Sequence, residues 1–216
     1  MSKVFYSSFC YTFYMEKFDQ MPNEEELVHH KISVIESIPT GVAPRGEAIL
    51  VLLGEKPGLE MYIPNEDNAP KAIEDLRSIG LFAELSEKSR EDDNPNSAEI
   101  LVASSQEVLN ELKQTHAHEH HKRYGQLMGY PDTAVDAFVG ENGQERLSRE
   151  EQRKLLDILP DILGGNFIFS KDHKDEEFAV VKRRIKLLAQ KAPELFYDLY
   201  KKEYADKILS YVLDYY

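Results

Sequence analysis

The hydrophobic pattern of the chain changes near residue 104, and this change limits the folds that it can adopt. Before that point, short apolar runs broken by Gly and Pro predict strands at 47–53, 59–63, 81–85 and 100–103. The first two are the expected arms of a hairpin. After residue 104, apolar residues recur at helical spacing. We therefore expect an α+β protein with a small mixed or antiparallel sheet in the N-terminal half, packed against a C-terminal helical region. The expected parts are 1–104 and 105–216, which also suit a single structural domain.

Capping patterns predict where several helices begin and end. Asn68 and Gly80 bracket one helix in the N-terminal half, and capping boxes at Ser104–Glu107 and Ser148–Glu151 mark two helix starts in the C-terminal half. The helix after Ser104 is expected to run to about Met128, where Gly129 can adopt the left-handed conformation that ends a helix. The run Gly129-Tyr130-Pro131-Asp132 then predicts a corner between this helix and the next. A short helix with Val135 and Phe138 buried should follow at 131–139, and two more should be separated near Pro193. For the aromatic-rich segment 4–18 we expect a strand, although a helix fits almost as well.

Composition excludes several classes of function. The chain of 216 residues has 26 Lys and Arg against 39 Asp and Glu, a formal charge of −13, so nucleic-acid binding is not expected. Its longest apolar run, 48–53, is too short to cross a membrane, and the N-terminus lacks a signal-peptide pattern. The single cysteine, Cys10, cannot form an internal disulfide, which favours a reducing, cytoplasmic location. No P-loop, dinucleotide-binding glycine motif or hydrolase elbow is present.

Four of the seven histidines fall within six residues: His116, His118, His120 and His121. If one helix runs through them, His116 and His120 share a face and can chelate a divalent metal such as zinc. A third ligand would have to come from elsewhere, with candidates Glu119, Asp132, Asp136, His173, His29 and His30. The spacing is not that of a metalloprotease, because the second ligand of His-Glu-x-x-His would fall on Lys122. The alternative is that these are surface histidines near a helix end.

A second possible chemistry needs no metal. An inward His120, with Tyr124 on the same helical face and Asp132 in the first turn of the next helix, would form an acid–base group. Arg123 would supply an anion contact there. The structural alternative is that Tyr124 packs in the core and Asp132 favours the positive end of its helix.

The segment 120–138, about 19 of the 216 residues, resembles part of a family of uncharacterised prokaryotic proteins. In that family a histidine-containing helix leads into Leu-Gly-Tyr-Pro-Glu-Cys-Cys-Val and then a Phe. Matching positions here are His120 or His121 and the run Gly129-Tyr130-Pro131-Asp132. The family has no assigned activity, so the resemblance implies where a site lies rather than what it does. Thr133 and Ala134 stand in place of the Cys pair, which excludes thiol chemistry at those positions.

Two hypotheses follow, and the sequence leaves open whether the chain is an enzyme. The first is a metal-dependent or acid–base enzyme, or a small-molecule binder, with its site in the segment 116–132. The alternative is a non-enzymatic regulatory protein that uses its acidic surface and a C-terminal helix to bind a protein partner. An exposed apolar stripe would favour the alternative, along Phe196, Leu199, Tyr204, Ile208 and Tyr211. The Lys182-Arg183-Arg184 run is expected on the solvent face of its helix.

Overall fold

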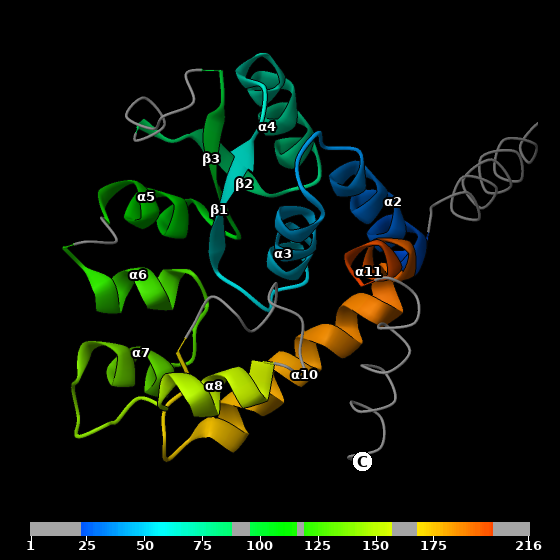
Figure 1. Ribbon diagram of the computed structural model, residues 1–216. Helices are drawn as coiled ribbons and strands as arrows, with labels where there is room; N and C mark the ends of the chain where they lie inside the picture. Colours follow the sequence, from blue (N-terminus) through cyan, green and yellow to red (C-terminus); the bar gives the residue numbers. More distant parts are fainter. Residues whose placement is uncertain (1–22, 88–95, 116–118, 157–167, 201–216) are drawn as a thin grey trace, which may run out of the picture.

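The computed structural model describes residues 23–87, 96–115, 119–156 and 168–200 (Figure 1). The N-terminal half contains α2 (Glu24–Glu36), α3 (Val42–Leu52), β1 (Gly58–Ile63), the short 3-10 helix η1 (Glu66–Asn68), α4 (Ala69–Ser78), β2 (Phe82–Leu85) and β3 (Ala98–Ala103). The C-terminal half contains α5 (Gln106–Gln114), α6 (His121–Leu127), α7 (Asp132–Val139), α8 (Arg149–Leu156), α10 (Lys174–Lys191) and α11 (Pro193–Leu199). The segment 4–18 lies outside the described residues, as do positions 204, 208 and 211.

The three strands form one antiparallel sheet in the order β1-β3-β2, so the expected α+β class is confirmed. The strands predicted at 59–63, 81–85 and 100–103 are present, as is the helix predicted from Ala69. Opposite residues of an antiparallel pair lie on one face of the sheet. One face therefore carries Leu59, Met61 and Ile63, all fully buried in a core shared with α3 and α4. The other carries Glu60 and Tyr62, and α5 covers only part of it.

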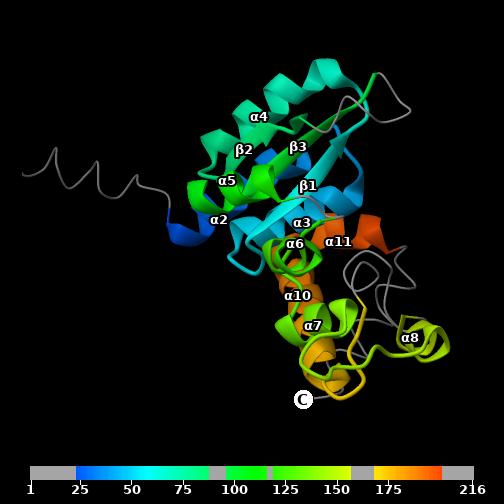
Figure 2. The same cartoon turned by 90° about the vertical axis from the view of Figure 1, so that its left-hand side faces the viewer.

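The packing of Gly58 shows which helix covers the second face. A side chain at Gly58 would meet Leu112 and Val108 of α5, and Lys113 of α5 forms an ion pair with Glu84 of β2 at 2.6 Å. Figure 2 shows α5 and α6 on the same side of the molecule, with α10 behind α6. The second face therefore looks toward α5 and α6.

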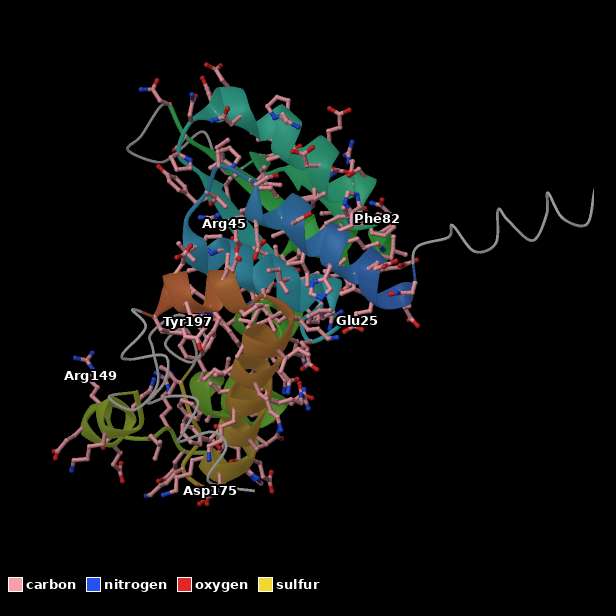
Figure 3. All side chains as sticks on the ribbon, turned by 90° about the vertical axis from the view of Figure 1, so that its right-hand side faces the viewer. Glu25, Arg45, Phe82, Arg149, Asp175 and Tyr197 are labelled. Atoms are coloured by element: carbon pink, nitrogen blue, oxygen red, sulfur yellow. The ribbon has the colours of Figure 1, made fainter. Side chains whose placement is uncertain are left out.

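The predicted strand at 47–53 is wrong, and the hairpin with it, because these residues belong to α3. Residues 48–51 are all buried, and an apolar run that is buried all round has no periodicity to separate a helix from a strand. Gly46 lets other helices approach α3 closely, with Leu188, Leu195 and Leu199 within 3.7 Å of the position of a Cβ. Figure 3 shows α11 lying beside α3.

The predicted helix through the histidine cluster is also wrong, because α5 ends at Gln114 and Thr115 is extended. The N-cap of α5 is Ser105 rather than Ser104. A capping box starts a helix but cannot extend it. The residues from Thr115 to His121 include no large aliphatic side chain that could anchor further turns to the core, and Thr and His are weak helix formers.

Most of the remaining C-terminal predictions are confirmed. Ser148 and Glu151 form the expected capping box, and α10 and α11 meet just before Pro193. Val135 is buried as expected, but Phe138 is 37% exposed. Phe196 is fully buried, so the proposed exposed stripe loses its first member. Within the part of the chain that the structure describes, no helix is long and apolar enough to span a membrane.

Candidate functional site

The segment from α6 to α7 forms a tight corner. Gly125 lies against Val135, where an added Cβ would be 2.9 Å from Cγ2, so α6 and α7 are in close contact. Gly129 has φ +75°, the left-handed conformation that ends a helix, and the Tyr130 amide donates to the Gly125 carbonyl at 2.9 Å. The corner predicted from Gly-Tyr-Pro-Asp is therefore present.

Arg184 of α10 attaches this corner to the N-terminal half. Its Nη2 donates to the carbonyl oxygens of Gly129, at 2.6 Å, and of Glu55, at 2.9 Å. The expectation that Arg184 faces solvent is wrong, since it is only 5% exposed. Its neighbour Arg183 does lie at the surface and pairs with the Glu55 carboxylate at 2.7 Å. Arg184 is buried because two backbone carbonyls accept its hydrogen bonds, and a charge pattern along one helix does not reveal such acceptors.

A buried ion pair lies beside this junction. Lys56 Nζ and Glu47 Oε2 are 2.5 Å apart, and Lys56 is almost fully buried. Burial lowers the pKa of the lysine, while the Glu47 carboxylate opposes that shift. Buried ions of this kind are retained only when a partner compensates the lost hydration, so the pair ties the middle of α3 to the segment just before β1.

Tyr124 joins α6 to the second face of the sheet. Its hydroxyl donates to Glu60 Oε2 at 2.6 Å, between residues 64 positions apart in the chain. Burial raises the pKa of Tyr124 above its ordinary value, and the bond to Glu60 adds to the shift. Burial, with the Glu47 charge, also raises the pKa of Tyr130 to about 12. Both phenols are therefore protonated donors at neutral pH.

The other predicted site residues have different surroundings. His116 lies outside the described residues. His120 is exposed just before α6, and His121 packs edge-on to Phe138 with ring centroids 5.5 Å apart. Asp132 is exposed at the first residue of α7 and accepts a bond from Gln126 at 2.9 Å. The predicted grouping of His120, Tyr124 and Asp132 is thus not seen as a hydrogen-bonded set.

Several other residues that were predicted to bind an anion or a metal form ion pairs within the chain. Arg123, expected to bind an anion, pairs with Glu111 of α5. Of the candidate third metal ligands, Asp136 pairs with Lys122 and His173 with Glu176. In residues 23–87, 96–115, 119–156 and 168–200, no three His, Cys, Asp or Glu side chains are grouped as metal ligands. His116 and His120 do not share the face of one continuous helix, so the metal hypothesis can no longer rest on that spacing, but it otherwise remains a prediction.

Thr133 contacts a buried carboxylate. Its hydroxyl donates to Glu177 Oε1 at 2.6 Å, and the Ser170 amide donates to Glu177 Oε2 at 2.8 Å. Glu177 is 1% exposed and lies in the first turn of α10, where the helix dipole favours a negative charge. The contact links α7 to α10 and accounts for a threonine at this position.

Sequence reasoning missed Glu60, Lys56, Arg184 and Glu177. Glu60 alone offered a signal, because a carboxylate between Leu59 and Met61 in a strand must face away from their side. The partners of the others lie 7 to 129 positions away in sequence, which local patterns do not reveal. Comparisons of the chain with protein-family models, with curated proteins and with solved structures found no match.

Proposed function

We propose that the chain binds a small cationic molecule, such as an amine, on the sheet face between α5 and α6, with Glu60 as its hydrogen-bond acceptor and Tyr124 as the residue that positions Glu60. The observation that carries the proposal is the 2.6 Å bond between the Tyr124 hydroxyl and the Glu60 carboxylate. Tyr124 lies in the segment that the histidine cluster and the family resemblance both favour. Groups whose pKa is shifted by burial and by a specific charged partner, as that of Tyr124 is, are more frequent at functional sites.

The chemistry of this sheet face supports a positively charged ligand. Tyr62 and Glu99 are directly opposite each other in the register, on the same face as Glu60, and Tyr62 is 45% exposed. Burial is the main cause of the raised pKa of Tyr124, and the charges of Glu60 and Glu99 add to it, so two carboxylates lie near this hydroxyl. Carboxylates beside an exposed aromatic ring attract ammonium and guanidinium groups through charge and cation–π contacts.

The two residues have distinct roles in this proposal. The Glu60 carboxylate accepts hydrogen bonds from the charged group of the ligand. Tyr124, whose raised pKa keeps it protonated, donates a hydrogen bond and holds the Glu60 carboxylate in place. We also propose a cytoplasmic location, because one cysteine cannot form an internal disulfide.

The test is calorimetric titration of the full chain with spermidine, arginine and choline, and with glycerol as an uncharged probe. At least one cation should bind saturably. Tyr124→Phe, which removes one oxygen, and Glu60→Gln, which removes the charge, should each weaken that binding by about tenfold, equal to about 1.4 kcal/mol.

The matched control is Tyr197→Phe, which removes the same oxygen from a 38% exposed tyrosine on α11. It should leave the affinity unchanged, and circular dichroism should show that all three variants are folded. Binding of no cation, or equal binding by wild type and Tyr124→Phe, would overturn the proposal.

A further inference from the structure

We draw no further inference here: the strongest candidate, the buried cluster of Lys56, Glu47 and Arg184 at the junction of α3, β1 and α10, carries none, because Lys56 binds Glu47, Arg184 binds the carbonyls of Glu55 and Gly129, and nothing in the described residues shows room for a ligand beside them.

Discussion

Substitution of Gly129 by alanine should destabilise the protein more than the same change at any other glycine that has this backbone conformation in the described residues. At φ +75° a side chain costs about 1–2 kcal/mol. The added Cβ would also lie 3.0 Å from Pro57 Cδ, 3.2 Å from Lys56 Cγ and 3.3 Å from Arg184 Nη2. None of these three neighbours can move easily, because Pro57 is a ring, Lys56 is paired with Glu47 and Arg184 binds two carbonyls. Overpacking of this kind costs about 1–3 kcal/mol, so the total loss is about 2–5 kcal/mol.

Gly140 provides the matched control for this prediction. It also has φ +75° and also follows a helix, but nothing lies within 4 Å of the position of its Cβ. Gly140→Ala should therefore cost only the backbone component, about 1–2 kcal/mol. The difference between the two variants isolates the close packing at the junction.

Urea unfolding followed by far-ultraviolet circular dichroism measures both losses, provided that the m-values match those of the wild type. The midpoint for Gly129→Ala should fall clearly below that for Gly140→Ala. Equal midpoints would refute the reasoning, because they would show that Gly129 is not closely packed against Pro57 and Arg184 in solution.

Three further predictions test other contacts. Thr133→Val should cost about 1–3 kcal/mol in urea unfolding, because it leaves the buried Glu177 carboxylate without one donor, whereas Thr133→Ser should retain most of the stability. Burial and the nearby charge of Glu194 raise the pKa of Glu36, so its charged form opposes folding, and this penalty disappears as the pH falls. Glu36→Gln should thus raise the melting temperature at pH 7, with a gain in the free energy of unfolding of less than about 1 kcal/mol. The gain should vanish below about pH 4, and a gain that persists there would contradict this cause. For the histidines at 116–121, the metal hypothesis predicts about one bound metal ion per chain in mass spectrometry of untagged protein. A metal content at background level would refute the hypothesis.

The sequence predicted the features that depend on local chemistry. The capping box at Ser148, the left-handed Gly129 and the break before Pro193 each follow from the conformational preference of one or two residues. Short apolar runs broken by Gly and Pro located the three strands of the sheet. The two large errors, the strand at 47–53 and the long helix after Ser104, have a common cause. In both, the outcome depends on contacts with the rest of the chain. The helix α3 is enclosed by other elements, and the residues that follow α5 include no large aliphatic side chain that could extend its packing.

The candidate site was predicted only in part for the same reason. Helical spacing placed Tyr124 on the apolar face of its helix, and it does point inward, to Glu60. His120 was expected on that face through a continuous helix, and it loses that position because α6 begins only at His121.

The position of Tyr124 depends on contacts that are remote in sequence. The carbonyl of Gly129, just after α6, is fixed by Arg184, which also binds the Glu55 carbonyl three residues before β1 begins. Because one guanidinium holds both segments, α6 and β1 keep a defined separation, and the bond between Tyr124 and Glu60 spans it. Buried hydrogen bonds of this kind are costly to break, since each broken bond leaves a buried polar group without its partner. The same guanidinium that joins the two halves of the chain thus helps to fix the distance between Tyr124 and Glu60, and its two backbone acceptors account for the burial of an arginine in a basic run.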